Sequence, residues 1–127
     1  MMVEQRCQDY LKFLQTRKLN TCSNLLIGEG GAGTFSDGKL FTRSKKRGDY
    51  NRALQRLVYH GATEAILYEA HPHIGSDRLP RIIADMRRQI VECGGEIHFN
   101  SRVTGITIKE NRAVGIEVGD QQIPGAA

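Results

Sequence analysis

The chain has 127 residues, of which 39% are hydrophobic and 25% are charged, and its formal net charge is +4. This length fits one domain with a modest core, and the composition is typical of a soluble globular protein, which excludes a disordered chain and predicts no membrane span. The positive charge would attract anions but does not by itself predict nucleic-acid binding.

The cysteines Cys7, Cys22 and Cys93 lie far apart and lack the C-x-x-C spacing of zinc and redox motifs. Their odd number also argues against a disulfide framework. The first residues alternate between polar and apolar types, so no secretory signal is predicted. We therefore expect a cytoplasmic protein.

The first half of the chain predicts two helices and a helical turn. Apolar residues recur at helical spacing from Val3 to Leu14. The apolar run Leu25–Ile27 predicts a short buried strand, or an extended lead-in to the glycine-rich segment Gly28–Lys39. Asp49 is a favourable N-cap for a helix from about Tyr50 to His60, and Thr63 is one for a short turn through Leu67.

The second half predicts a helix followed by strands. Ser76 and Asp77 are N-cap candidates for a helix that ends at Gly94–Gly95. Its apolar positions are Leu79, Ile82, Ile83, Met86 and Ile90. Alternating apolar residues then predict strands through Ile97 and Phe99, through Val103, Ile106 and Ile108, and through Val114, Ile116 and Val118. The predicted fold class is α+β, with amphipathic helices and a C-terminal antiparallel β-meander.

The glycine-rich segment Gly28–Lys39 is the most informative part of the sequence, because five glycines occur in the eleven residues from Gly28 to Gly38. Glycine permits positive φ angles and lets a ligand come close to the backbone. This density therefore predicts a loop shaped around a ligand, and the alternative is a connector that binds nothing.

Two phosphate-binding patterns fit this segment in part. The pattern G-x-G-x-x-G begins at Gly28, but no helical repeat follows it as a dinucleotide fold requires. The pattern G-x-x-x-x-G-K begins at Gly33 and ends at Lys39, but Leu40 stands where a magnesium-binding Ser or Thr is needed. Neither pattern alone identifies the ligand.

Other candidate sites are weaker. The basic run Arg43–Arg47 is interpreted as a solvated loop, because few aromatic residues flank it. His71 and His73 could hold a metal ion, but only Asp77 offers a third ligand, so we predict a structural loop and no metal site. No G-x-S-x-G elbow presents a nucleophile near Ser36, and no catalytic residue is predicted.

The chain stops at Ile123–Ala127, directly after a strand-like run and without a polar tail. We expect from this ending that residues 1–127 form a single partial domain, left by truncation of a longer protein.

Three strings carry a resemblance to a known family: GEGGAGTFSDGKL, PHIGSDRLPRIIADMR and CGGEIHFNSRVTGI. Their order and spacing resemble those of the uncharacterised FAD-dependent dehydrogenases, also called NAD(FAD)-utilising dehydrogenases, over roughly residues 20–123. Members of this bacterial family are much longer, and their own G-x-G-x-x-G lies upstream of this region. The resemblance implies the middle part of an α/β FAD/NAD(P)-binding domain that lacks its N-terminal fingerprint.

The resemblance also implies a cofactor site. The glycine-rich segment would line the pyrophosphate and flavin side of FAD, and the backbone at Val103 would pair with the adenine edge. The residues so implied are Gly30, Gly31, Gly33, Ser36, Lys39 and Val103. The complete protein would be an oxidoreductase acting on a small molecule that the sequence does not define, whereas the isolated chain would bind FAD weakly or not at all and lack turnover.

Two alternatives stay open. A phosphate- or nucleotide-binding protein would use the glycine-rich segment directly with Lys39. A non-catalytic interaction module would form a homo-oligomer through apolar surfaces that truncation exposes. Neither nucleic-acid nor membrane partners are predicted.

Overall fold

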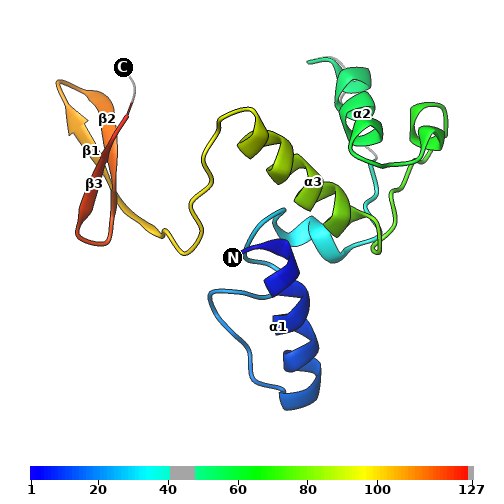
Figure 1. The fold of residues 1–127 in the computed structure, drawn as a ribbon, viewed down its shortest axis with the longest axis horizontal. Coiled ribbons are helices and arrows are strands. Elements are labelled where there is room, and N and C mark those ends of the chain that lie inside the picture. Colours follow the sequence, from blue (N-terminus) through cyan, green and yellow to red (C-terminus); the bar gives the residue numbers. More distant parts are fainter. Residues whose placement is uncertain (41–47, 126–127) are drawn as a thin grey trace. The chain divides into compact units, whose positions relative to one another are not determined.

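The computed structural model describes residues 1–40 and 48–125, and the chain divides into two compact units, Met1–Ile97 and His98–Ala127 (Figure 1). The first unit contains the described helices and the second contains the described sheet. The basic run Arg43–Arg47 lies outside the described residues. That the chain forms a single partial domain stays a prediction.

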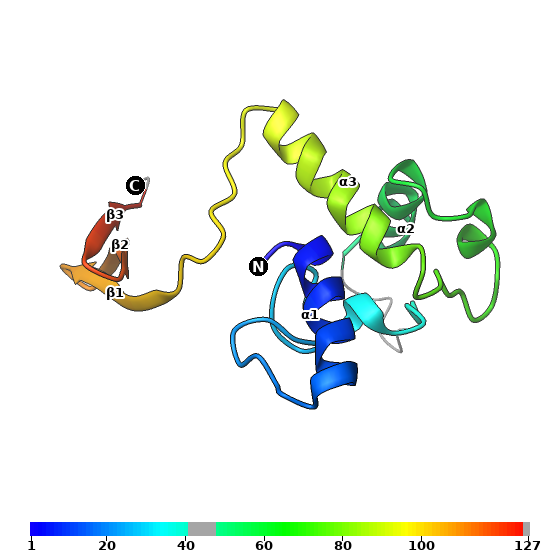
Figure 2. The same ribbon diagram turned by 60° about the horizontal axis from the view of Figure 1, so that its bottom comes forward.

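Helix α1 spans Val3–Thr16 and confirms the helix predicted from apolar spacing. It ends at Arg17, which has a φ of 58° and donates its N–H to the carbonyl of Phe13 at 2.8 Å. This left-handed residue closes the helix and turns the chain. Figures 1 and 2 show the following segment running back beside α1.

The predicted buried strand at Leu25–Ile27 is wrong, because this segment consists of bends. Leu26 and Ile27 are exposed, and both donate their N–H groups to the side-chain oxygen of Asn24, at 2.8 and 3.2 Å. An asparagine that takes both amides in a local turn leaves them unavailable for strand pairing. A short 3₁₀ helix, η1, follows at Ala32–Phe35.

Helix α2 spans Tyr50–Tyr59 and begins as predicted, since the Asp49 carboxylate accepts the N–H of Arg52 at 2.9 Å. The predicted turn is the 3₁₀ helix η2, Glu64–Leu67, although the Thr63 side chain makes no capping hydrogen bond. The buried core joins α2, η2 and α3 with the loops between them. Its members are Leu54, Ala62, Ile66, Ile74 and Ile82.

Helix α3 spans Leu79–Glu92. The prediction that Ser76 or Asp77 caps this helix is wrong, because Arg78 occupies the N-cap position and its side chain makes no capping hydrogen bond. A backbone turn replaces the side-chain cap. The N–H of Arg78 donates to the carbonyl of Gly75 at 3.3 Å, which closes the chain into the first helical turn.

The predicted end of α3 is confirmed. Gly94 has a φ of 84°, and the N–H of Gly95 donates to the carbonyl of Ile90 at 2.8 Å, the closure expected when a glycine follows a helix.

Near the middle of α3, Asp85 accepts a hydrogen bond of 2.7 Å from Nδ1 of His60, which follows α2. This contact lowers the pKa of the Asp85 carboxyl from its ordinary value.

The second unit is a three-stranded antiparallel sheet, which confirms the predicted C-terminal antiparallel β-meander. Strands β1 (Val103–Lys109), β2 (Arg112–Val118) and β3 (Gln121–Pro124) lie in the order β1-β2-β3. Glu110 and Asn111 join the first two strands with positive φ angles of 47° and 62°, as a two-residue hairpin turn requires.

The predicted strand through Ile97 and Phe99 is wrong. Residues 95–98 pair with no described strand, and Phe99 and Asn100 form a turn in which Asn100 has a φ of 59°. Alternation of apolar residues does not create a strand where a left-handed residue interrupts the extended backbone.

The described helices and sheet together make an α+β fold, as predicted, and none of those helices is long and apolar enough to cross a membrane.

Candidate functional site

The side chain of Arg6, on α1, is fully buried at 0% exposure and holds the glycine-rich segment in place. Its guanidinium donates hydrogen bonds to the backbone carbonyls of Asn24, Leu25, Glu29 and Gly31. The bonds to Leu25 and Gly31 measure 3.0 and 2.9 Å. A buried cation is stable only when its donors find acceptors, so these bonds fix the path of residues 24–31.

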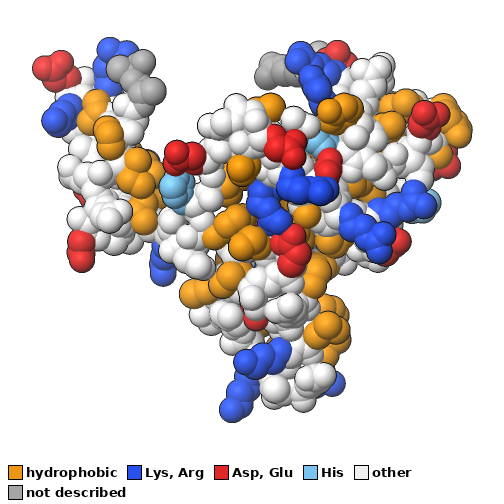
Figure 3. Space-filling view, in the orientation of Figure 1, with side chains coloured by type: hydrophobic (Ala, Val, Ile, Leu, Met, Phe, Trp, Pro, Cys, Tyr) orange, Lys and Arg blue, Asp and Glu red, His pale blue; other side chains and the backbone are white. Residues whose placement is uncertain are grey.

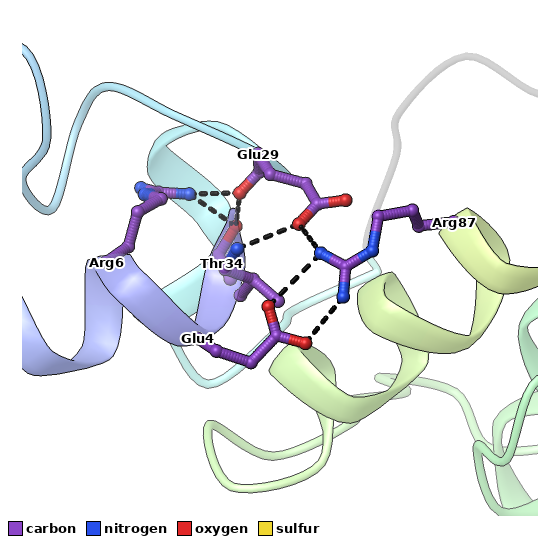
Figure 4. Close-up of polar contacts among 6 residues, drawn as sticks. Glu4, Arg6, Glu29, Thr34 and Arg87 are labelled. Carbon is purple, nitrogen blue, oxygen red and sulfur yellow. Dashed lines mark hydrogen bonds and ion pairs between the residues drawn. The ribbon is translucent and has the colours of Figure 1, made fainter. Parts of the chain in front are cut away.

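Two side chains complete the surroundings of this guanidinium. The hydroxyl of Thr34 accepts from Nη1 of Arg6 at 3.2 Å (Figure 4). It donates to the carbonyl of Gly31 at 3.0 Å. The ring of Phe35 lies 4.9 Å from the guanidinium carbon, a cation–π contact. Burial lowers the pKa of Arg6 from its ordinary value, yet an arginine remains a cation at neutral pH.

Gly28 and Gly30 are required by the fold of this chain itself. Gly28 has a φ of 125°, and a Cβ atom there would overlap the side chain of Arg6. Gly30 has a φ of 79°, and a Cβ atom there would overlap the hydroxyl of Thr34. Their presence follows from backbone conformation and packing, without any ligand.

Gly31 and Gly33 differ from Gly28 and Gly30, because a Cβ atom at either position would meet nothing within 4 Å. Gly31 still needs its φ of 67°, whereas Gly33 has no positive φ. Within the described part of the chain, the N–H groups of Gly30, Ala32 and Gly33 form no hydrogen bond, and these residues are exposed. Exposed amides beside open space are suited to bind an anionic or carbonyl oxygen.

Ser36 and Lys39 occupy the far end of the segment. The Ser36 hydroxyl donates to the carbonyl of Gly33 at 2.7 Å and accepts the N–H of Gly38 at 3.1 Å, so it shapes the loop. The Lys39 ammonium is exposed and lies 3.4 Å from the Asp37 carboxylate. A surface hollow of about 420 Å³ is lined by Asp37, Lys39, His71, Pro72 and His73.

A second polar cluster joins α1, the glycine-rich segment and α3. The Glu29 carboxylate accepts the N–H of Val3 at 2.8 Å and pairs with the guanidinium of Arg87 at 2.7 Å (Figure 4). The same guanidinium pairs with Glu4 at 2.6 Å. The hydrogen bond between Arg87 and Glu4 lowers the pKa of the Glu4 carboxyl and raises that of the guanidinium.

The structure brings five of the six predicted cofactor residues into one loop of the first unit: Gly30, Gly31, Gly33, Ser36 and Lys39. Val103 is the first residue of β1 in the second unit, where it pairs with Val118 and is half exposed. His71 and His73 line the hollow beside the loop, and no group of three potential metal ligands occurs among the described residues.

Neither Arg6 nor Arg87 was predicted from the sequence as a site residue. Arg6 follows Val3 by three positions and therefore lies on the apolar side of α1, where a charged residue signals a buried partner. Arg87 lies on the charged side of its helix and carries no comparable signal. Its partners are 58 and 83 residues away in sequence, and only the tertiary fold brings them together.

No protein-family model matches the chain. The chain is similar to an uncharacterised protein of Clostridium beijerinckii (strain ATCC 51743 / NCIMB 8052), with 40% identity over 121 residues. The match covers 95% of this chain and 22% of that protein, so the chain spans about a fifth of the length of this curated relative.

The two classes of glycine should differ in their effect on stability. We expect Gly28→Ala to lower the free energy of unfolding by more than about 1 kcal/mol, because the new methyl group overlaps Arg6 in a strained backbone. Gly33→Ala should change it by less than about 1 kcal/mol. Urea unfolding followed by circular dichroism measures both, and an equal loss in the two variants would mean that Gly33 also has a structural role.

The ion pair between Glu4 and Arg87 should make stability depend on pH in the acidic range. The folded state lowers the pKa of Glu4, so the contribution is present above the unfolded value of about 4.3 and is lost as the pH falls through the folded value. The Glu4→Gln variant should be less stable than the parent at pH 6, by less than about 1 kcal/mol because Glu4 is partly exposed.

Urea midpoints measured from pH 6 down to strong acid test this expectation. The difference between Glu4→Gln and the parent should disappear at the acidic end, whereas Glu64→Gln, at an exposed position on η2, should match the parent throughout. A difference between Glu4→Gln and the parent that stays constant across the range would contradict the proposed linkage.

Proposed function

We propose that this chain is part of an FAD-dependent oxidoreductase and that residues 28–39 contact the pyrophosphate and flavin side of FAD. The observation that carries the proposal is Gly33, a glycine that neither the backbone conformation nor the packing of this chain requires. A glycine at such a position leaves room for a ligand against the backbone.

The residues present fit this cofactor. The amides of Gly30, Ala32 and Gly33 would donate to phosphate or carbonyl oxygens, and the ammonium of Lys39 would attract the negative charge. Arg6 would keep this loop in one conformation before FAD binds, which reduces the entropic cost of binding. The flavin supplies electron transfer when bound, and the chain supplies binding and orientation.

Two further observations support parts of the proposal. The relative from C. beijerinckii is several times longer than this chain, which leaves room for the remainder of an FAD domain in a protein of that kind. Cys7, Cys22 and Cys93 are free thiols, which supports a cytoplasmic location. We further propose that the substrate is a small molecule and that the isolated chain has no turnover.

FAD binding is tested on two proteins, this 127-residue chain and the longer C. beijerinckii relative. We expect the relative to purify with flavin absorbance at about 450 nm and this chain to bind FAD only weakly. In the chain, FAD should shift the NMR signals of the amides at residues 30–33. Gly33→Val should weaken this binding at least about tenfold, because a side chain would fill the space that the ligand needs.

A titration of two lysine variants with ATP distinguishes FAD binding from nucleotide binding by the loop. Absence of flavin from both proteins would overturn the FAD proposal. ATP binding that is lost in Lys39→Ala and kept in Lys109→Ala, a substitution of an exposed lysine on β1, would instead support a nucleotide-binding loop. Unchanged FAD affinity in Gly33→Val would also contradict the proposed contact.

A second candidate function is homo-oligomer formation, and the sheet favours it. Ile106 on β1 pairs with Ile116 on β2, which pairs with Ile123 on β3, so the three side chains form one apolar row. Ile106 and Ile123 are 62% and 41% exposed, and Figure 3 shows apolar side chains at the surface of this unit. We propose that a second copy covers this row, because an isolated three-stranded sheet gains stability by packing one face.

Sedimentation equilibrium of the chain tests the oligomer, with Ile123→Lys and Gln122→Lys as a matched pair. Neighbouring residues on a strand point to opposite faces. We therefore expect Ile123→Lys to shift the chain to a monomer and Gln122→Lys to leave the oligomer intact. A parent chain that stays monomeric at high concentration would contradict this candidate function.

A further inference from the structure

A cavity of about 580 Å³ lies in the first unit, between α1 and the segment that runs back beside it. Its walls are mostly apolar and include Tyr10 and Phe13 from α1 and Leu19, Leu25 and Leu26 from the segment. This size is within the range of cavities that bind small molecules. The cavity is lined by residues 9–27, and the exposed amides of the glycine-rich segment are not among them.

Two buried polar atoms of lining residues have no hydrogen-bond partner in the described part of the chain. They are Oγ of Ser23, whose residue is only 1% exposed, and Oδ2 of Asp9. The other carboxylate oxygen of Asp9 accepts from the Gln5 side chain at 3.2 Å. A buried carboxylate oxygen without a donor is costly, and native proteins rarely leave one unsatisfied.

The wall opposite α1 is held in one conformation before any ligand binds. The Asn24 side chain accepts the N–H of Leu26 at 2.8 Å and donates to the carbonyl of Asn20 at 2.8 Å. From the other side, Arg6 binds the carbonyls of Asn24 and Leu25. A cavity whose wall is fixed by such bonds loses little conformational entropy when it is filled.

We propose that this cavity binds a small organic amine. Among the described residues that line it, Asp9 is the one charged residue, and its carboxylate, turned about χ2 toward the cavity, can accept from an ammonium group. The rings of Tyr10 and Phe13 suit both an apolar body and a neighbouring positive charge. The proposal is independent of FAD binding by the glycine-rich segment.

The test titrates the 127-residue chain with 2-phenylethylamine, with neutral 2-phenylethanol and with anionic phenylacetate, and follows the backbone amides by NMR. We expect the amine to shift the signals of residues 9–27 and to bind at least about tenfold more tightly than the alcohol, since a hydrogen bond to a charged group is worth more than a neutral one. Phenylacetate should bind more weakly than either.

Four variants make the test specific. Asp9→Asn should remove most of the preference for the amine over the alcohol, whereas Asp120→Asn, in the turn between β2 and β3, should preserve it. If Asp9→Asn does not fold, Leu26→Trp serves instead, because Leu26 is 70% exposed and a larger side chain there would obstruct the cavity and abolish binding. Gly33→Val should leave amine binding unchanged.

The proposal is overturned if phenylacetate binds as tightly as the amine, if the shifts lie outside residues 9–27, or if Asp9→Asn keeps the full preference. It is also overturned if the amine does not bind and the chain forms a dimer that Leu26→Trp disrupts, because the cavity would then accommodate a second copy.

Discussion

A positive charge buried without exposed surface needs several acceptors at once, and the guanidinium of Arg6 finds them in the backbone of the glycine-rich segment. The segment uses carbonyl oxygens to bind this cation, while the amides of Gly30, Ala32 and Gly33 form no hydrogen bond within the described residues. Gly28 must lack a side chain because Arg6 occupies the adjacent space. The shape of the loop is thus set by a contact from α1.

Glu29 ties the same loop to the rest of the first unit. Its carboxylate caps the first N–H of α1, where a negative charge is also favourable to the helix dipole, and it pairs with Arg87 on α3. Because Arg87 binds Glu4 as well, ion pairs of one guanidinium connect α3 with both α1 and the loop. Loss of Arg87 would leave two carboxylates without their cation.

The two proposed ligand sites depend on the same anchor. Arg6 binds Gly31 in the glycine-rich segment and Leu25 in the wall of the apolar cavity, so one side chain determines both surfaces. A change at Arg6 would disturb the two sites together. For this reason each site is tested with a variant at a residue other than Arg6, namely Gly33 for the loop and Asp9 for the cavity.

Much of the secondary structure was predictable from local sequence, because apolar spacing, the Asp49 cap, the Gly94–Gly95 stop and the meander depend on neighbours a few residues away. The sequence also located the glycine-rich segment and its candidate ligand-facing residues. It failed at Leu25–Ile27, where the Asn24 side chain takes the amides that a strand would use. Only the tertiary structure separated Gly28, which makes room for Arg6, from Gly33, which faces open space, because that difference lies in contacts between residues distant in sequence.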